Sequence, residues 1–343
     1  MKARCLFVLF GIFCIVVSTQ GQEWTRNFRI GMQLGLNIKA DFKTSGTLPL
    51  STKNPGVSGQ QGDHEFDDGF VRVDATGNAG GTTSYWSAQN PSQSDGSTLT
   101  FHHADSFQSA TSVNKTGDDS PYIGFELAYG GTIRRWGHSR LGWEFGFGYL
   151  PIDIKSSIRL SGTLNFTQWL DPTVTPTVPQ GVVLPNLPYT GSPGGIGVNI
   201  PGNPTEDDHL SGPGTLTGTR SLDLTLYSFR LGPTYYWHFA PKWGLSASAG
   251  PALGIVNGDY LFDEIGTTGS VTTHPTGKFS NSDFIFGGYV NALVLYRLQD
   301  NGDLFAGVQF MSLTSSQFSR GGRSATLDPS GGFYFTTGIN WPF

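Results

Sequence analysis

The sequence predicts an all-β fold, an up-and-down antiparallel β-barrel that crosses a membrane with eight strands. Three observations predict it. Apolar residues alternate with small or polar residues at a period of two in eight separate runs. The connections between these runs alternate between short and long, and aromatic residues gather at the ends of the runs. A content of 13% aromatic and only 14% charged residues, with 48 glycines, is typical of half-apolar strands joined by Gly-rich loops.

The first residues predict export. Lys2 and Arg4 precede a short apolar run, and small residues follow it, so residues 1–21 form the pattern of a secretory signal peptide. The mature barrel would then comprise residues 22–343. Both cysteines, Cys5 and Cys14, lie in the removable segment, which predicts a mature chain without disulfides. Acidic residues outnumber basic ones, 26 to 21, and such an exported chain is not expected to bind nucleic acid.

Eight runs carry the strand pattern. They occupy residues 28–42, 121–133, 141–149, 227–239, 243–255, 284–298, 304–311 and 331–343. In the third run, for example, Trp143, Phe145 and Phe147 alternate with Glu144, Gly146 and Gly148. One apolar face and one small or polar face are expected where the outer face meets lipid and the inner face lines a lumen.

The connections between the runs indicate the orientation of the barrel. Short turns are expected at residues 135–140, 240–242 and 299–303. The long links are the predicted extracellular loops, at residues 43–118, 155–219, 264–281 and 318–330. Outer-membrane barrels have short periplasmic turns and longer extracellular loops, so an even strand count predicts an integral outer-membrane protein with periplasmic termini and loops at the cell surface.

Aromatic residues are expected to mark both membrane interfaces. A periplasmic girdle is predicted near the short turns, formed by Trp136, Trp143, Trp237, Trp243 and Trp341. At the opposite ends of the runs, an outer girdle would contain Phe42, Tyr149, Tyr227 and Phe284.

The last run, SGGFYFTTGINWPF, alternates aromatic residues and ends in Phe343. This ending, together with the eight runs, resembles the small OmpA-like and OmpW-like outer-membrane barrels of Gram-negative bacteria. The resemblance implies that Phe343 is the signal read by the barrel-assembly machinery. It also implies contact with outer-membrane lipid and lipopolysaccharide. Pro342 departs from the commonest endings because it lacks an N–H group.

Outside the predicted membrane section, the pattern changes. After Tyr149 and before Tyr227 the apolar residues shift phase in the sequence, and we interpret this as a hairpin that continues above the lipid with a bulge at each shift. Its Pro-rich tip, residues 171–214, is expected to be mobile. In the first long loop, residues 70–73 and 99–101 are expected to pair as a small hairpin or, in a ten-stranded alternative, to join the barrel wall.

Charged residues on inward positions predict a paired network in the lumen. Six of them form the expected network, namely Arg29, Glu126, Glu144, Arg230, His238 and Arg297. The alternation also places Lys39 and Asp41 inward. An eight-stranded barrel is just wide enough to be filled by side chains, so the network is expected to block ions, and replacing Glu126 and Arg230 by Ala is expected to raise the number of opening events.

Three groups of acids and histidines in the loops are candidate cation sites. They contain Asp63, His64, Glu65, Asp67 and Asp68; His102, His103 and Asp105; and Glu206, Asp207, Asp208 and His209. Their spacing matches no known loop site, so solvated loop residues are the favoured interpretation, and no cofactor or metal is expected. The remote alternative of a lipid-modifying enzyme would use Ser312 or Ser315 as nucleophile with a loop histidine, but no spacing unites these residues.

The sequence therefore predicts a barrel without catalytic activity, whose extracellular loops carry a structural or surface-contact role. The main alternative is a transporter of small apolar molecules, which the OmpW-like resemblance implies.

Overall fold

The computed structural model describes residues 26–109, 113–117, 121–172, 184–195, 197–269, 271–299 and 302–342. The predicted signal peptide, residues 1–21, lies outside the described residues, and so does Phe343.

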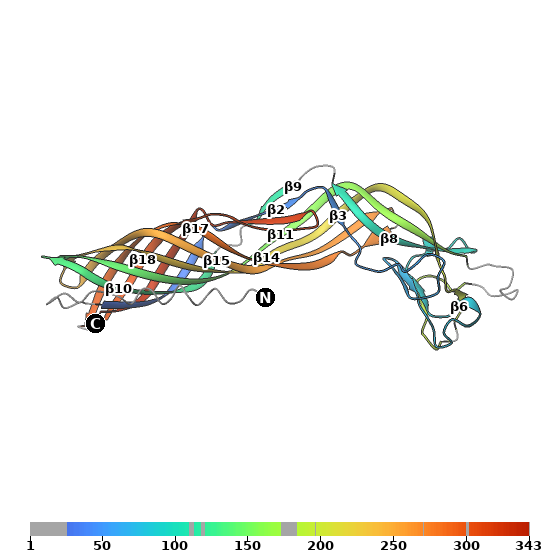
Figure 1. The fold of residues 1–343 in the computed structure, drawn as a ribbon, viewed down its shortest axis with the longest axis horizontal. Coiled ribbons are helices and arrows are strands. Elements are labelled where there is room, and N and C mark those ends of the chain that lie inside the picture. Colours follow the sequence, from blue (N-terminus) through green and yellow to red (C-terminus); the bar gives the residue numbers. More distant parts are fainter. Residues whose placement is uncertain are drawn as a thin grey trace.

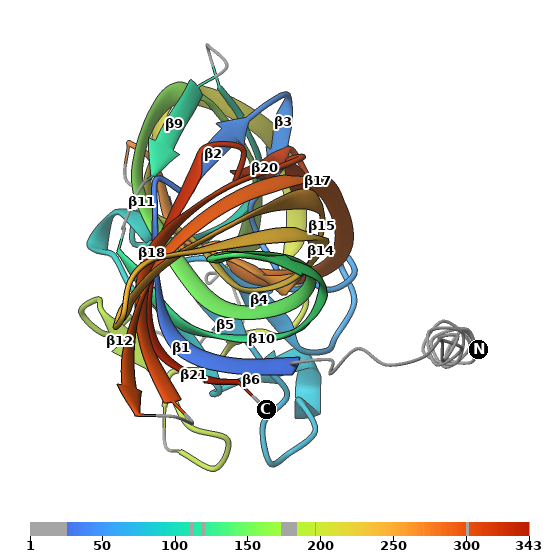
Figure 2. The ribbon, with the colours of Figure 1, turned by 90° about the vertical axis from the view of Figure 1, so that its left-hand side faces the viewer.

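A ring of antiparallel strands forms the main body of the protein (Figures 1 and 2). Within the described residues, eight strands follow one another around the ring. In spatial order they are β10 (Tyr122–Trp136), β1 (Arg26–Leu36), β21 (Gly332–Pro342), β18 (Gly302–Leu313), β17 (Thr276–Gln299), β15 (Trp243–Thr268), β14 (Thr205–Ala240) and β11 (Ser139–Pro172). Pairing of β10 with β11 closes the ring. The predicted fold, a closed antiparallel barrel, is confirmed.

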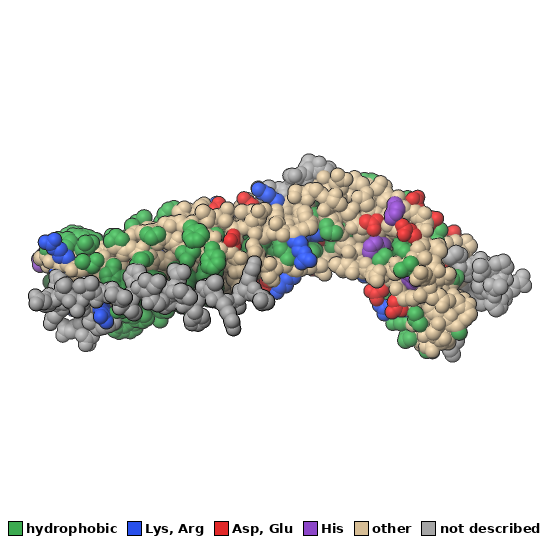
Figure 3. Space-filling model, in the orientation of Figure 1, with side chains coloured by type: hydrophobic (Ala, Val, Ile, Leu, Met, Phe, Trp, Pro, Cys, Tyr) green, Lys and Arg blue, Asp and Glu red, His purple; other side chains and the backbone are tan. Residues whose placement is uncertain are grey.

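The section of the ring nearest the short turns has an apolar outer face and a polar inner face. The exposed apolar side chains of this section lie on all eight strands and include Phe28, Ile30, Met32, Ile123, Phe125, Phe145, Leu231, Leu245, Phe286, Val290, Val294, Val308, Phe310, Phe335 and Ile339. In Figure 3 many hydrophobic side chains lie on the left-hand half of the molecule. Such a belt on a closed barrel, around a polar interior, is the arrangement of a membrane-spanning section.

Beyond Tyr149 the strands continue, but the two faces exchange character. Gly146 and Gly148 point into the lumen, and Leu150, Ile152 and Ile154 follow them on the same inward face, where they are at most 2% exposed. The β11–β14 register runs without a shift from Ser139↔Trp237 to Gln168↔Asp208. The predicted bulges at Tyr149 and Tyr227 are therefore wrong. The strand keeps its phase while its surroundings change from lipid to water, so the apolar residues move from the outer to the inner face.

A change of phase does occur elsewhere, at the end of β1. Asn37 has a φ of +58°, in the left-handed region, and separates β1 from β2 (Lys39–Thr44). After this residue Ala40 and Phe42 are buried, whereas Lys39 and Asp41 point outward. The prediction that Lys39 and Asp41 line the lumen is wrong, and so is the prediction that Phe42 belongs to a girdle, because a single residue in the left-handed conformation exchanges the two faces.

Above the apolar belt the ring opens into two facing sheets. One sheet continues β11, β14, β15 and β17. The other sheet contains β9 (Val113–Gly117), β2, β20 (Arg323–Asp328) and β19 (Ser316–Arg320). Between them lies a core that includes Ile38, Phe42, Leu150, Ile152, Leu222, Leu224, Val256, Tyr260, Phe279, Ile285, Leu313, Phe318 and Leu327. We call this two-sheet section the stalk; it bends away from the membrane-spanning section in Figure 1.

The far end of the stalk carries a folded cap, at the right of Figure 1. Strands β3 (Thr47–Pro49) and β8 (Thr98–Ser109) first extend the stalk sheet beside β11. The cap itself contains a sheet of β12 (Tyr189–Thr190), β7 (Trp86–Ala88), β5 (Gly69–Val71) and β4 (His64–Phe66), and a second pair, β6 (Thr82–Thr83) with β13 (Ile200–Pro201). Strand β16 (Val271–Thr273) pairs with β15.

Two predictions about this region are wrong. Residues 70–73 do not pair with residues 99–101, because β5 pairs with β4 and β7 while β8 pairs with β11. Neither segment joins the closed ring.

The described part of the Pro-rich tip is not an unstructured loop either, since Leu187, Tyr189 and Ile200 pack into the cap core around Trp86. Apolar residues supplied by the first long segment give this tip a surface on which to pack, which its own composition does not provide.

Helical structure is limited to two short 3-10 turns in the described residues, η1 (Ala79–Gly81) and η2 (Pro91–Gln93). None of the helices described is long and apolar enough to cross a membrane.

Candidate functional site

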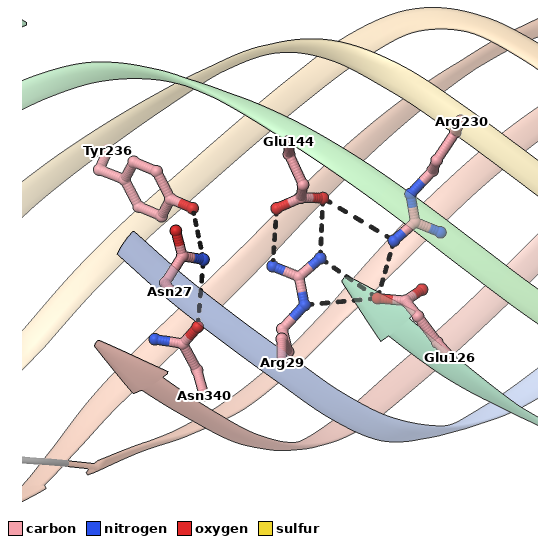
Figure 4. A network of polar contacts seen from close by, with 7 residues as sticks. All are labelled: Asn27, Arg29, Glu126, Glu144, Arg230, Tyr236 and Asn340. Atoms are coloured by element: carbon pink, nitrogen blue, oxygen red, sulfur yellow. Dashed lines mark hydrogen bonds and ion pairs between the residues drawn. The ribbon is translucent and has the colours of Figure 1, made fainter. Parts of the chain in front are cut away.

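The candidate site is a cluster of four charged side chains in the lumen of the membrane-spanning section (Figure 4). Arg29 projects from β1, Glu126 from β10, Glu144 from β11 and Arg230 from β14. Each occupies an inward position of its strand, so the alternation that places apolar residues against lipid also brings these four together. All four side chains are at most 3% exposed.

The cluster is held by charge-assisted hydrogen bonds centred on Arg29. Its Nη1 and Nη2 donate to Oε2 and Oε1 of Glu144, both at 2.9 Å. Its Nε and Nη2 also lie 3.3 and 3.2 Å from Oε1 of Glu126. Arg230 Nη2 is 2.8 Å from the same Glu126 oxygen and 3.8 Å from Glu144 Oε1. Two carboxylates and two guanidinium groups give the cluster no net charge, which is the condition under which buried charges are tolerated.

Small residues on neighbouring strands make room for this cluster. A Cβ atom on Gly146 would lie 2.5 Å from Nε of Arg230, so a glycine is required where the Arg230 side chain crosses β11. On the opposite side, the Arg29 guanidinium lies 5.1 Å from the ring centroid of Phe305. The side chains thus fill the cross-section of the lumen at this level.

A second polar layer lies between the cluster and the short turns. Asn27 Nδ2 donates to Tyr236 Oη and to Asn340 Oδ1, both at 3.3 Å. Asn340 Nδ2 in turn donates to Asp303 Oδ2 at 3.0 Å. Asn27, Tyr236 and Asn340 appear beside the charge cluster in Figure 4.

Two of the six residues predicted for the lumen network do not join it. His238 and Arg297 lie at the open end of the barrel beside the short turns, where they line a pocket together with Arg135, His138 and Arg140. The Arg297 side chain is half exposed, and its Nε lies 4.0 Å from Asp303 Oδ1. Counting from the short turns, the sequence places both residues near the periplasmic end of the barrel, and there they are. The same count puts Arg29 and Glu144 at that level too, but strand stagger sets these two higher, in the lumen cluster.

The tryptophans predicted for the periplasmic girdle gather at the same end. Trp136, Trp237, Trp243 and Trp341 are 40–46% exposed on the outer surface, and Trp143 is partly buried against Tyr129, with ring centroids 5.7 Å apart. At the other limit of the apolar belt, the rings of Tyr149 and Tyr227 lie 5.7 Å apart. Phe343, the predicted assembly signal, follows Pro342 outside the described residues.

The stalk contains a second buried charge cluster, which the sequence reasoning missed. Glu264 of β15 accepts from Arg220 Nε of β14 at 2.7 Å and from Arg323 Nη2 of β20 at 2.6 Å. Arg220 also donates through Nη1 to Thr44 Oγ1 of β2 at 2.7 Å. These contacts join the two facing sheets. The sequence did contain a signal for this cluster. Arg220 lies on the same face of its strand as the apolar residues Leu222, Leu224 and Leu226, which points to a charged side chain inside an apolar core.

The acids and histidines of the three loop groups act mainly as local hydrogen-bond partners. Asp68 accepts from the amide of His102 at 2.8 Å and pairs with Nδ1 of the same histidine at 2.6 Å. Asp67 Oδ2 accepts from the Ala104 amide at 2.6 Å.

The other members of these groups have similar contacts. His64 is buried between the carbonyl oxygens of Pro55 and Gln60, and Glu65 pairs with Arg72. Asp63 accepts from the Val73 amide at 3.0 Å. His209 contacts Glu206 at 2.9 Å, and His103 lies 4.0 Å from Asp105. Across the described ranges, no group of three or more such side chains is placed to hold a metal ion.

One carboxylate in the cap has an unusual environment. Asp171, near the end of β11, is fully buried, and neither of its oxygens has a hydrogen-bond partner in the described part of the chain. Burial raises its pKa to about 8 because the charged form is not solvated. At neutral pH this side chain is therefore expected to be mostly neutral.

The residues considered for a lipid hydrolase are not assembled. Ser312 lies on β18 opposite Gly288, and Ser315 lies between β18 and β19. The histidine contacts seen in the described residues involve backbone carbonyls, carboxylates, Thr167 and aromatic rings, and none involves either serine.

Comparisons with known proteins give only distant structural similarities. No protein-family model matches the sequence, and no curated protein matches it. Among solved structures, OmpT, the outer membrane protease of Escherichia coli, has 10% identity and a TM-score of 0.32, with 95% of this chain and 100% of that chain covered. Ail, the attachment invasion locus protein of Yersinia pestis, has 9% identity and a TM-score of 0.26, covering 94% and 100%.

A FadL homologue of Pseudomonas aeruginosa has 8% identity and a TM-score of 0.19, covering 92% of this chain and 90% of that chain. The assignment of this chain to the outer-membrane type of β-barrel rests on its own closed ring and apolar belt.

Proposed function

We propose that this protein is a non-enzymatic outer-membrane barrel whose stalk presents the cap to surfaces outside the cell. The observation that carries the proposal is the continuous pairing of β11 with β14, from the short turns to the cap, around an apolar core. A transmembrane strand needs only about 9–11 residues. Strands of 34 and 36 residues are therefore far longer than membrane insertion requires.

The length of the stalk supports a contact role. Residues 150–172 of β11 follow the apolar belt and would extend for roughly 75 Å at the usual rise of a strand. Because this section has a packed core and the buried Arg220–Glu264–Arg323 cluster, it is expected to behave as a rigid spacer. A rigid spacer places the cap beyond the headgroups of the outer leaflet, where lipopolysaccharide or another surface is the partner.

The interior of the barrel supports the same role. The lumen cluster fills one level of the membrane-spanning section, and the stalk core fills the next. Two successive filled levels favour a scaffold over a conduit for polar solutes.

The proposed orientation can be tested by cysteine labelling on intact cells. The only cysteines of the sequence lie in the predicted signal peptide, so a new one reports a single position. Val57→Cys introduces a thiol at a 59% exposed position of the cap, and His138→Cys places one at an exposed short turn. A membrane-impermeant maleimide is expected to label Val57→Cys in intact cells and His138→Cys only after permeabilisation. The reverse pattern would overturn the orientation.

The contact role needs a separate experiment. Trp86 is fully buried in the cap, and its Nε1 donates to the carbonyl of Val198 at 2.7 Å. Trp86→Asp is expected to unfold the cap while the barrel remains inserted, as judged by heat-modifiable migration. Cells producing the wild-type chain should be retained on lipopolysaccharide-coated or matrix-coated surfaces more than cells producing the variant. Equal retention on both surfaces would contradict a contact role for the cap.

A transporter of small apolar molecules is the second candidate, favoured by one observation. The last β17–β18 pair is Gly287↔Leu313, followed by one more backbone hydrogen bond, from Thr314 N to Phe286 O at 2.9 Å. Above it β17 meets β19 through side-chain contacts such as Ser316 Oγ to Asp283 Oδ2 at 3.0 Å. This seam leads from the upper limit of the apolar belt towards the apolar stalk core. Saturable binding of a hydrophobic fluorescent probe, reduced by Ile285→Trp in that core, would support transport, whereas non-saturable partitioning would count against it.

A further inference from the structure

The open end of the barrel beside the short turns holds an unbalanced group of basic side chains. A pocket of about 680 Å³ lies there, between the β10–β11 and β14–β15 turns. Its lining includes Arg135, His138, Arg140, His238 and Arg297. Figure 3 shows basic side chains gathered at the corresponding left-hand tip. We call this feature the basic mouth.

The basic mouth differs from the lumen cluster in its charge balance. The four charges of the lumen cluster cancel, and their hydrogen bonds explain why they are buried. At the mouth, the ion pair seen in the described residues is the long contact of Arg297 with Asp303, at 4.0 Å. Asp303 also accepts from Asn340, so its carboxylate is shared. Arg135 and Arg140 make no ion pair within the described ranges.

Arg140 supplies a second, independent sign of a ligand site. Its guanidinium is stacked over the Tyr236 ring, 4.1 Å from the centroid, which fixes the plane of the group. Its Nε is buried and has no hydrogen-bond partner in the described part of the chain. A fixed, planar and unpaired guanidinium is preorganised to bind an oxyanion, because little side-chain entropy is lost when the bonds form.

We propose that the basic mouth binds a phosphate-type oxyanion, with Arg140 and Arg297 as its principal ligands and Arg135 and His138 at the rim. Guanidinium groups bind phosphate oxygens through two parallel hydrogen bonds, and several positive charges around one cavity favour an anion with more than one negative charge. The site lies at the opposite end of the molecule from the cap and does not depend on the proposed contact role.

Two sources offer this chemistry. One is a soluble phosphate compound that enters from the side of the short turns. The other is the headgroup of a neighbouring phospholipid, because the exposed Trp237 and Trp243 place the membrane interface at the same end.

The first experiment measures anion binding to the purified full chain, refolded in a non-ionic detergent and phosphate-free buffer. Pyrophosphate titrated by calorimetry is expected to show one saturable site. Arg140→Gln and Arg297→Gln are each expected to weaken binding at least tenfold. Arg159→Gln is the matched control, since Arg159 is exposed on the outer face of the stalk and its replacement removes the same charge. Binding that is absent, or equal in the wild type and both mouth variants, would overturn the proposal.

Variants that fail to fold are identified by heat-modifiable migration. If Arg140→Gln is lost in this way, the half-exposed Arg297 provides the decisive variant.

The second experiment distinguishes the sources by repeating the titration in nanodiscs. If lipid headgroups occupy the mouth, anionic phosphatidylglycerol should weaken pyrophosphate binding relative to phosphatidylcholine in the wild type and not in Arg297→Gln. If the wild type binds pyrophosphate equally in both lipids, and Arg297→Gln still binds it more weakly than the wild type, the site is assigned to a soluble anion.

Discussion

Arg29 and Glu144 form a two-bond ion pair inside the lumen, with both N–O distances at 2.9 Å, although the residues are 115 positions apart in the sequence. The pair connects β1 with β11, which are not neighbours in the ring, because β10 lies between them. It therefore links two strands on the same side of the inner wall, directly across the intervening β10. Glu126 and Arg230 complete the cluster, so the stability of the whole membrane-spanning section is expected to depend on its charge balance.

Removing one member of this cluster should be costly. Arg29→Met leaves Glu144 buried with Arg230, at 3.8 Å, as its remaining charged partner, and breaking a buried pair in this way typically costs about 3–5 kcal/mol. The double variant Arg29→Met/Glu144→Leu should lose less stability than Arg29→Met, because no unpaired carboxylate remains. Urea unfolding in phosphatidylcholine vesicles, followed by tryptophan fluorescence, measures both. Additive losses in the double variant would show that the two side chains are not coupled.

Conduction is the second test. The wild-type protein should show little steady conductance in planar bilayers, because the lumen cluster and the stalk core fill successive levels. The sequence alone predicts more opening events after Glu126→Ala/Arg230→Ala. With the stalk core in place, we expect any such events to be brief. Large, steady channels from the double variant would mean that the stalk core is not a barrier.

The cap should lose stability as the pH rises. The pKa of Asp171 is about 8 in the folded protein and 3.8 ordinarily, so the folded state binds more protons between these two values. Stability contributed by the neutral form is therefore present at low pH and lost as the pH rises from about 4 to about 8. Hydrogen exchange of the β8 amides at pH 5.5 and pH 8.5, corrected for intrinsic rates, measures this loss. Asp171→Asn should flatten the dependence, while Asp207→Asn, at an exposed position, should preserve it.

The stalk should be sensitive to Glu264. Glu264→Gln leaves Arg220 and Arg323 buried beside each other without a carboxylate, at a cost of about 3–5 kcal/mol. The adjacent Asp263→Asn is the control, because Asp263 is exposed on the other face of the same strand. Faster hydrogen exchange in β2 and β20 of the Glu264 variant alone is the expected result. Equal exchange in both variants would show that the cluster does not hold the two sheets together.

Assembly tests the role of the last residue. Deleting Phe343, or replacing it with Asp, should leave the chain in the periplasm as a substrate for proteases, since the terminal strand is expected to be read by the barrel-assembly machinery. Membrane fractionation measures the result. Normal amounts of heat-modifiable protein in outer membranes would argue against this role.

Much of the membrane-spanning section follows from the sequence by itself. Alternation at a period of two predicts which residues face lipid and which face the lumen, and the structure gathers the predicted Trp136, Trp237, Trp243 and Trp341 at one end. The facing of Arg29, Glu126, Glu144 and Arg230 also follows from alternation, because lipid tolerates few charged side chains and each strand must therefore keep a strict pattern.

Only the tertiary structure decided which of these residues meet, and what the segments outside the membrane become. His238 and Arg297 lie near the short turns, as counting along the strands predicts, but strand stagger separates them from Arg29 and Glu144, which the same count puts at their level. The conformation of Asn37 moves Lys39 and Asp41 out of the interior. The cap core joins Trp86 to Tyr189 and Ile200, from segments that show no strong local pattern. The alternation of residues along a strand reflects whether each of its faces meets lipid, water or protein, so it can be read locally. Register, stagger and contacts between distant segments depend on the packing of the whole chain.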